Sequence, residues 1–411
     1  MICTNAHRAI VILLAALAAT GGAKAWADVV TEWDATACAA VVNAKLNPAA
    51  ATHVVAIVQT AAYEAANAVT GRYPASGLPV AAAPGASVEA AIAAASRVTL
   101  AELVPSQQAM VDAAYDAALA RIVDGPAEAA GVAAGESAAA AVLAVHADDG
   151  CAARETYRPL TAPGVYVPTV IPAVPTWPQR KPWLMASADQ LRPGPPPALA
   201  SEVWARDYNE IKALGSKDSA FRTPAQTEVA RFWEATQPSI YHGVVSSVAT
   251  APGREITQNA RLLAAASQAA DDALVAIFDA KYHYNFWRPV TAIRNGDVDG
   301  NPATERDPAW TPFIDTPMHP EYPCAHCVMS AAVGTVLEAE IGSGPMPTLT
   351  TTSPTANGSA RSWTSIDDFV GEVANARIWD GVHFRNSTEV GAAMGRQVGK
   401  LAVARYMRRT D

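Results

Sequence analysis

The sequence predicts an all-α protein composed of helical bundles. The chain has 411 residues, of which half are hydrophobic and 17% are charged, so it is long and apolar enough to bury a large core. Apolar residues recur with the 3.6-residue period of a helix, and few segments alternate between apolar and polar residues. Long alanine-rich stretches present small side chains that let helices approach closely. A bundle is therefore the most economical arrangement.

Residues 1–27 predict a signal peptide and hence a secreted or periplasmic protein. A short polar segment ends at Arg8, the run Ala9–Ala18 is apolar, and Ala25-Trp-Ala27 fits the small-x-small cleavage pattern. The apolar run is shorter than the roughly 20 residues of a spanning helix. We expect cleavage after Ala27, which leaves Asp28 as the mature N-terminus. We also expect no integral membrane segment in the mature chain, because no other uncharged run is long enough.

Residues 28–157 predict a helical N-terminal region. Apolar residues between Val54 and Ala65 follow the helical period, and Gly71 is a natural stop for this helix. Further helices are expected at residues 88–103, 107–123 and 127–147.

Residues 158–200 form a Pro-rich connector that ten or more prolines interrupt. A segment of this length without secondary structure often covers or borders a functional site in a compact domain. A connector that simply wraps the surface between two bundles is the alternative.

Residues 201–411 predict a second helical domain. Helices are expected at residues 201–214, 223–235, 256–284, 364–378 and 387–407. Ser365 and Asp368 at the start of the fourth resemble a capping box. The last helix carries apolar residues, Val390 and Met394 among them, on one face.

The charge and the cysteines limit the classes of function. A net charge of −9 without a basic stripe argues against nucleic acid as the partner. In an oxidising compartment, Cys38 and Cys151 are one possible disulfide pair. Cys324 and Cys327 have the spacing of a redox pair but lack the strand-and-helix setting of such a motif. We therefore interpret Cys327 as a small buried residue on a helix.

A first segment with catalytic potential contains Lys281 and Arg288. The two residues lie seven apart, which is two helical turns, so they are predicted to project from one helix face. Pro289 is expected to end or bend the helix. An arginine beside a lysine is suited to fork onto two oxygens of an anion. Two solvated cations are the alternative, which the aromatic residues between them disfavour.

A second segment, Pro323-Cys-Ala-His326, leads into an apolar helical stretch. The backbone N–H groups of Cys324, Ala325 and His326 are expected at a helix N-terminus, which binds anions. His326 is a candidate general acid or base. Taken alone, a histidine at a helix start is more often structural.

A third segment contains Arg377 and His383, six residues apart, with a turn expected at Asp380-Gly381. Arg377 is predicted to close one helix and His383 to precede the next, so that both converge on one point. His383 is a candidate nucleophile or metal ligand, because an imidazole nitrogen is a good donor for either role. Together the three segments predict a site for an anion with several negative oxygens, such as phosphate or vanadate.

The order of these motifs resembles the vanadium-dependent haloperoxidase and type 2 phosphatidic acid phosphatase superfamily. Lys281-x6-Arg288-Pro, Pro-x-x-His326 and Arg377-x5-His383 carry the resemblance. The helical first half, Trp233 and the Pro-rich segment are similar to the bacterial haloperoxidase-like branch. The resemblance implies an all-α fold with the site in a C-terminal four-helix bundle.

The resemblance also implies roles for individual residues. Vanadate, or phosphate in a phosphatase, would be held by Lys281, Arg288, Cys324, Ala325, Arg377 and His383. His326 would be the acid–base residue, Lys281 would polarise peroxide, and His383 would bond to vanadium or phosphorus. His319, seven residues before His326, would shift the halide preference toward bromide or iodide, with a structural role as the alternative.

Three positions depart from the family pattern. Cys324 replaces a serine and Ala325 replaces a glycine, and a thiol is a weaker donor than a hydroxyl and is open to oxidation. Ser387 stands four residues after His383, where phosphatases carry an acid that orients the histidine.

These observations favour a vanadate-dependent haloperoxidase that uses hydrogen peroxide and a halide, bromide or iodide, as small-molecule substrates. The alternatives are an acid or lipid phosphatase that acts on phosphate esters through a phosphohistidine, and an exported protein that binds an oxyanion without catalysis. The missing acid at Ser387 and the long N-terminal half, which is not a membrane domain, favour the first.

Overall fold

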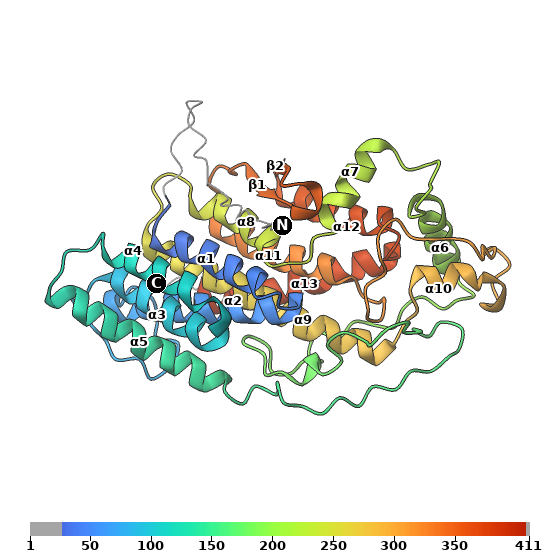
Figure 1. The fold of residues 1–411 in the computed structure, drawn as a ribbon. Coiled ribbons are helices and arrows are strands. Elements are labelled where there is room, and N and C mark those ends of the chain that lie inside the picture. Colours follow the sequence, from blue (N-terminus) through green and yellow to red (C-terminus); the bar gives the residue numbers. More distant parts are fainter. Residues whose placement is uncertain (1–26, 408–411) are drawn as a thin grey trace, which may run out of the picture.

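The computed structural model describes residues 27–407, and in this part the chain forms thirteen α-helices and one two-stranded hairpin (Figure 1). The all-α prediction is confirmed. The hairpin was not predicted; β1 (Leu349–Thr352) pairs antiparallel with β2 (Ala360–Trp363). The predicted signal peptide falls almost entirely in residues 1–26, outside the described residues.

Five helices form the N-terminal region. They are α1 (Val29–Asn43), α2 (Pro48–Thr70), α3 (Val88–Leu103), α4 (Gln108–Leu119) and α5 (Pro126–His146). Gly71 ends α2 in the left-handed conformation, with φ 59°, as the sequence predicts. The sequence analysis missed α1, whose start is fixed by a capping box between Asp28 and Thr31.

Eight helices follow the Pro-rich segment. They are α6 (Glu202–Leu214), α7 (Pro224–Trp233), α8 (Ser239–Ala249), α9 (Ile256–Tyr284), α10 (Pro289–Arg294), α11 (Ala325–Ile341), α12 (Ile366–Trp379) and α13 (Arg385–Tyr406). The helix α8 was not predicted. Ser365 caps α12 through a hydrogen bond from the backbone N–H of Asp368, so the predicted start is confirmed to within two residues.

The long helix α9 joins the two parts of the chain (Figure 1). It packs against α2 of the N-terminal region and against α11 and α13, and α12 packs on α11 and α13. One continuous hydrophobic core contains side chains from both the N-terminal helices and this four-helix group. Three glycines on α13 let it approach α11 closely, since a Cβ at Gly395 would overlap the carbonyl oxygen of Val328.

The Pro-rich segment contains one short 3-10 helix, Trp177–Gln179, and runs along the lower side of the molecule in Figure 1. It is tied to the segments that carry the candidate site. The backbone N–H of Tyr166 donates to the carbonyl oxygen of Asn285 at 2.8 Å, and that of Ala173 donates to Met318 at 2.6 Å. The segment therefore borders the site rather than simply connecting two bundles.

Lys281 and Arg288 do not lie on one helix, which corrects the sequence prediction. Asn285 adopts the left-handed conformation, with φ 47°, and ends α9 at Tyr284. Arg288 instead is the N-cap residue of α10, with Pro289 in its first turn. The chain thus turns between the two cations, and their convergence depends on tertiary structure rather than on helical spacing.

Of the cysteine predictions, the possible pair of Cys38 and Cys151 was wrong, whereas Cys327 is buried on α11 as predicted. Cys38 and Cys151 are both free, the first buried on α1 and the second exposed after α5. Cys324 and Cys327 form a disulfide across the first turn of α11. A spacing of three residues at a helix start brings the two Cα atoms to 5.4 Å, within the range of a disulfide.

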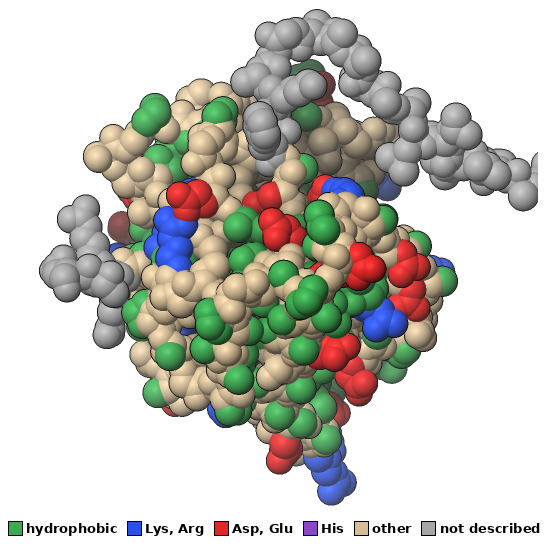
Figure 2. All heavy atoms as spheres, turned by 90° about the vertical axis from the view of Figure 1, so that its left-hand side faces the viewer, with side chains coloured by type: hydrophobic (Ala, Val, Ile, Leu, Met, Phe, Trp, Pro, Cys, Tyr) green, Lys and Arg blue, Asp and Glu red, His purple; other side chains and the backbone are tan. Residues whose placement is uncertain are grey.

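The surface charge bears on nucleic acid as a partner, and the composition of α5 bears on the membrane. On the face in Figure 2, lysine and arginine side chains are scattered singly among acidic and apolar ones and form no basic stripe. The helix α5 is long and apolar enough to cross a membrane by length and composition, although it is not an uncharged run, since it contains Glu128 and Glu136. It packs on α3, where Gly131 and Gly135 allow close contact, and 44% of its most apolar stretch is buried. Whether the mature chain has a membrane segment stays a prediction.

Candidate active site

The loop His319–Pro323 holds both cations of the first segment. The ammonium group of Lys281 donates to the carbonyl oxygens of Pro320 and Glu321 at 3.0 and 2.7 Å. The guanidinium of Arg288 donates through Nε to the carbonyl oxygen of His319 at 2.8 Å. Both cations are fully buried, so these carbonyl oxygens replace part of the water that they lose.

His383 lies between Arg288 and an acid. Its Nδ1 is 2.8 Å from Oε1 of Glu321, and its Nε2 is 3.3 Å from Nη1 of Arg288. The same Glu321 oxygen accepts the backbone N–H of Phe384 at 3.0 Å. His383 follows the turn after α12 and precedes α13, as predicted, and is 1% exposed.

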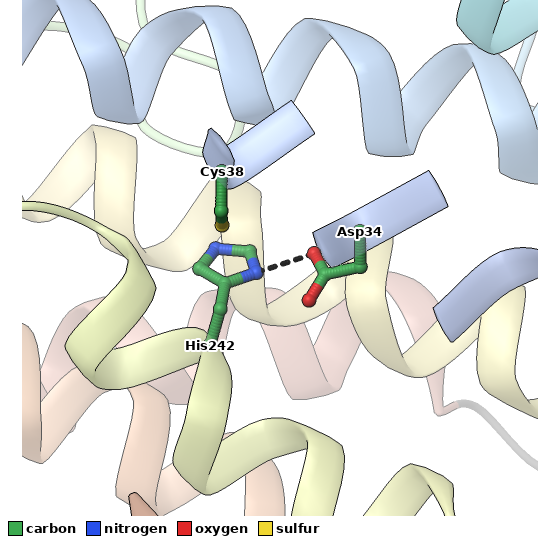
Figure 3. Close-up of side chains that lie close together, drawn as sticks. All are labelled: Asp34, Cys38 and His242. Carbon is green, nitrogen blue, oxygen red and sulfur yellow. Dashed lines mark hydrogen bonds and ion pairs between the residues drawn. The ribbon is translucent and has the colours of Figure 1, made fainter. Parts of the chain in front are cut away.

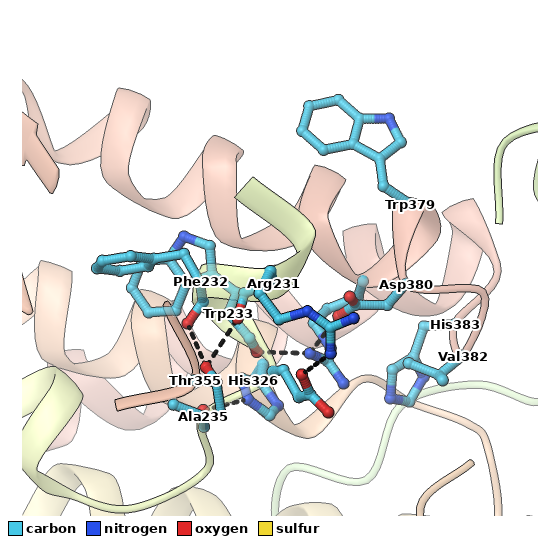
Figure 4. Close-up of polar contacts among 12 residues, drawn as sticks. Arg231, Phe232, Trp233, Ala235, His326, Thr355, Trp379, Asp380, Val382 and His383 are labelled. Carbon is cyan, nitrogen blue, oxygen red and sulfur yellow. Dashed lines mark hydrogen bonds and ion pairs between the residues drawn. The ribbon is translucent and has the colours of Figure 1, made fainter. Parts of the chain in front are cut away.

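Arg377 approaches from the last turn of α12. Its Nη1 donates to the carbonyl oxygen of Trp233 at 2.6 Å and forms an ion pair with Asp380 at 2.5 Å (Figure 4). Its Nε is buried and has no hydrogen-bond partner among residues 27–407. Arg377 therefore has an unused donor beside the cavity that it lines.

His326 lies in the first turn of α11, after the N-cap residue Cys324. Its Nε2 is 3.1 Å from the carbonyl oxygen of Ala235 (Figure 4). Since a carbonyl oxygen only accepts, Nε2 carries the proton and donates. This leaves Nδ1 as the basic nitrogen of the ring.

A cavity of about 310 Å³ is lined by several of the predicted residues. Its polar lining includes His319, His326, Arg377 and His383, and Ala325 lies at its wall. Arg288 lines a neighbouring cavity of about 590 Å³, and Pro317 and Met318 separate the two. Lys281 and Cys324 line neither cavity. The two histidines and the three cations thus gather in one buried region, although their roles stay a prediction.

The walls of the 310 Å³ cavity come from both halves of the chain. Residues at the start of α2, the Pro-rich segment, α8, α9 and α11 all contribute. The apolar wall residues are Pro48, Ala49, Ala173, Val174, Tyr241, Leu274, Phe278, Met318 and Met329. The site is therefore incomplete without the N-terminal region.

Cys324 cannot act as the hydrogen-bond donor that was predicted for the family's serine. Its sulfur is bonded to Cys327 and so carries no hydrogen. It only accepts, from the backbone N–H of Cys327 at 3.2 Å. Donors at this end of α11 must come from the backbone, because the first N–H groups of a helix have no partner within the helix.

The site is buried and rich in positive charge. Burial, reinforced by Arg288, lowers the pKa of Lys281 well below its usual range, and burial lowers the pKa of Arg288 to about 10. Burial and the neighbouring cations also lower the pKa of His319, His326 and His383, so all three rings are neutral near pH 7. An anion among these groups would offset the crowded positive charge.

Two buried acids that the sequence analysis did not assign support these groups. Glu321 contacts His383, and Asp380 pairs with Arg377. Burial raises the pKa of each to about 7, against the opposing effect of Lys281 on Glu321 and of Arg377 on Asp380. The sequence did contain a signal for both acids, because each lies within or beside a predicted motif. Glu321 stands between His319 and Pro323, and Asp380 stands three residues after Arg377.

A second buried polar cluster lies away from this region (Figure 3). His242 of α8 contacts Asp34 of α1 at 2.6 Å through one ring nitrogen, and the sulfur of Cys38, one turn further along α1, lies near the other nitrogen. Burial raises the pKa of the Cys38 thiol well above its usual range, so the thiol is neutral and unreactive. We interpret this cluster as structural.

A third cluster joins α2 to α9. His53 contacts Asp271 through Nδ1 at 2.7 Å and Asp149 through Nε2 at 3.0 Å, and Arg180 pairs with Asp149. Burial alone would lower the pKa of His53, but the two carboxylates outweigh it and raise the pKa to about 9. The two carboxylates thus face two cations, while Oδ1 of Asp271 and Nδ1 of the adjacent His146 have no hydrogen-bond partner in the described part of the chain.

The third cluster predicts a pH dependence of stability. Because the folded pKa of His53, about 9, exceeds the usual 6.5, its stabilising effect is full below pH 6.5 and is lost as the pH rises through 9. We expect the free energy of unfolding to fall by up to about 3 kcal/mol over this range. Urea unfolding at pH 6.5 and 9.5 measures it. His53→Gln should remove this slope, and an equal slope in the variant would contradict the assignment.

A known protein family matches the part of the chain that contains the candidate site residues. Residues 261–411 match the family model described as the VCPO second helical-bundle domain. A solved structure of the first bacterial vanadium-dependent iodoperoxidase is similar, with a TM-score of 0.79 and 23% identity over 92% of this chain and 95% of that one. None of the curated proteins compared with this chain matches it.

Two structures of a bacterial vanadium-dependent chloroperoxidase are similar as well. The apo form has a TM-score of 0.70 at 18% identity, over 88% of this chain and 94% of that one. The holo form has a TM-score of 0.71 at 18% identity, over 92% of this chain and 97% of that one. Identities this low establish a shared fold, and with the family match they confirm the resemblance to the vanadium haloperoxidase superfamily.

Proposed function

We propose that this chain, which has the fold of the vanadium-dependent haloperoxidase superfamily, is an enzyme that oxidises halide with hydrogen peroxide. The observation that carries the proposal is the gathering of Lys281, Arg288, Arg377 and two neutral histidines in one buried region beside a cavity. The fold match to bacterial haloperoxidases includes the N-terminal region, which supplies part of the cavity wall.

The residues present fit vanadate as the bound group. Arg377 has a buried donor without a partner, and Lys281 gives two hydrogen bonds to carbonyls, which leaves one N–H of its ammonium group. Further donors are Arg288 and the backbone N–H groups at the start of α11. Nε2 of His383 is the nitrogen ligand. Vanadate, when bound, would supply a Lewis acid that activates peroxide without changing its own oxidation state.

The side chains have separable tasks in this proposal. His383 holds the oxyanion through Nε2, and Arg288 and Arg377 neutralise its negative oxygens. His326 accepts a proton from hydrogen peroxide through Nδ1, since its lowered pKa keeps the ring neutral. Lys281 donates toward the bound peroxide oxygen. The apolar cavity wall excludes water and so strengthens each of these interactions.

His319 supports a preference for bromide or iodide, as part of the same proposal. Its Nδ1 lies 3.0 Å from Nη2 of Arg288, and its ring packs edge-to-face on Phe278 at 5.2 Å. It therefore lies in the cavity, in contact with one of the cations.

A phosphatase remains the second candidate, and one observation now favours it more than the sequence did. The acid that is missing at Ser387 was an argument against a phosphohistidine mechanism. Glu321 provides a carboxylate at Nδ1 of His383 from another part of the chain, so this argument no longer separates the two functions.

One set of assays tests the proposal. Purified protein is incubated with vanadate, hydrogen peroxide and bromide or iodide, and separately with p-nitrophenyl phosphate without vanadate. We expect halide oxidation that depends on vanadate. Release of phosphate that vanadate inhibits would support the phosphatase instead, and vanadate binding without either activity would indicate a non-catalytic oxyanion-binding protein.

Cys324→Ser is expected to raise whichever activity is present by about fivefold, the effect of one added hydrogen bond. Serine restores an O–H donor at the N-cap of α11, where the disulfide sulfur has none. Cys327→Ser is the matched control, because it breaks the same disulfide without adding that donor. Equal rates in both variants would show that a hydroxyl group at position 324 does not raise the activity.

Export is a separate part of the proposal. Cleavage after Ala27 would leave Asp28, whose side chain caps α1, at the mature N-terminus. N-terminal sequencing of the secreted or periplasmic protein checks this, and a mature chain that still contains residues before Ala27 would contradict it.

A further inference from the structure

Glu321 and His383 are in direct contact although 62 residues separate them in the chain. Glu321 is not exposed at all, and it lies in the loop that both Lys281 and Arg288 contact through its backbone carbonyls. Two nitrogens of the His383 segment lie near one oxygen of Glu321: Nδ1 of His383 at 2.8 Å and the backbone N–H of Phe384, which donates at 3.0 Å. This oxygen, Oε1, is thus fixed as an acceptor.

The neighbours of His383 determine which ring nitrogen carries the proton. A carboxylate oxygen that already accepts from Phe384 accepts from Nδ1 as well, so Nδ1 is protonated. At the other side of the ring, Nη1 of Arg288 lies 3.3 Å from Nε2, and a guanidinium can only donate. Two independent contacts therefore agree on one neutral tautomer, with the lone pair on Nε2.

We propose that Glu321 is the positioning residue for His383, which it holds in the tautomer whose Nε2 can bond to the oxyanion. It replaces, from the loop before α11, the acid that the family pattern has four residues after the histidine and that is Ser387 here. The inference deepens the proposed function and rests on it for the identity of the oxyanion. The tautomer itself depends only on the contacts of Glu321 and Arg288.

Positioning affects binding in two ways. A free imidazole populates both neutral tautomers, so only part of the molecules would present a lone pair at Nε2. A carboxylate at the other nitrogen also raises the basicity of the bonding nitrogen, as in the carboxylate–histidine pairs that support metal sites. Removing such a partner typically weakens binding by about 10–100-fold.

Glu321→Met tests the inference, because methionine fills similar space without an acceptor oxygen. Nitrogen-15 NMR of histidine-labelled protein without vanadate reports the tautomer of His383, whose signals are identified by their absence in His383→Gln. We expect one tautomer in the wild type and a mixture, or the other tautomer, in Glu321→Met. Vanadate titration should show binding weaker by about 10–100-fold.

Two further variants make the result decisive. Glu321→Gln keeps an oxygen for both N–H groups but loses the charge, so it should retain the tautomer and bind vanadate more weakly than wild type, though less so than Glu321→Met. This variant also carries the test if Glu321→Met does not fold. Glu389→Gln, an exposed acid on α13, is the matched control and should behave as wild type.

Two outcomes would overturn the inference. One is a Glu321→Met variant with wild-type His383 signals, and the other is wild-type vanadate affinity in Glu321→Gln and Glu321→Met alike. A failure of the proposed function looks different. In that case the wild type shows a single His383 tautomer and binds an oxyanion, but does not oxidise halide.

Discussion

Replacing His383 by alanine is expected to lower peroxide-dependent halide oxidation by about a thousandfold or more. The substitution removes Nε2 of His383. The contacts of the ring with Glu321 and Arg288 leave the lone pair on this nitrogen, where it can bond to the oxyanion. The cations remain, so vanadate should still bind, but more weakly. Initial rates of bromide and iodide oxidation and a vanadate titration measure the two effects.

The control for this prediction is His283→Ala, two residues beyond Lys281 and exposed. It removes an imidazole from the same segment without touching the cavity, and should leave both measurements unchanged. Retained halide oxidation in His383→Ala would place the chemistry elsewhere in the molecule.

Replacing Arg377 by methionine is expected to abolish oxyanion binding and to destabilise the protein by about 3–5 kcal/mol, the effect of removing one partner of a buried ion pair. Arg377 and Asp380 are 1% and 0% exposed, and both carboxylate oxygens of Asp380 lack any other hydrogen-bond partner in the described part of the chain. The loss of Arg377 thus leaves a buried negative charge. Urea unfolding measures the stability and vanadate titration the binding.

The stability loss should depend on pH. Burial already raises the pKa of Asp380 to about 7, and without Arg377 the pKa rises further. In the unfolded chain the Asp380 carboxyl loses its proton near the usual pKa of about 4. The free energy of unfolding therefore falls as the pH rises from about 4 to the pKa of Asp380 in the folded protein. Arg377→Met should therefore be closest to wild type in stability at low pH.

A double variant separates the two effects of Arg377. Arg377→Met with Asp380→Asn removes the unpaired charge and should recover part of the stability but none of the oxyanion binding. If the double variant binds vanadate as wild type does, Arg377 is a structural residue only.

Much of the fold was predictable because helices are specified locally. The ranges of α3 and α9 were predicted to the residue, and α2 ends at Gly71 as expected. Three helices were missed: α10 has only six residues, and α1 and α8 are mostly buried. The hairpin has two strands of four residues, too short for a clear alternation.

The sequence by itself determined which chemical groups are available: three cations and two histidines in three motifs whose order is specific to one superfamily. It also determined most of the helices, because period and capping depend on neighbours within a few residues. Only the tertiary structure decided that Arg288 leaves the helix of Lys281, that Cys324 pairs with Cys327 rather than donating to an anion, and that Glu321 orients His383 across 62 residues. These outcomes depend on how the ends of distant helices meet, since only the folded core fixes which polar groups are buried together and must satisfy one another.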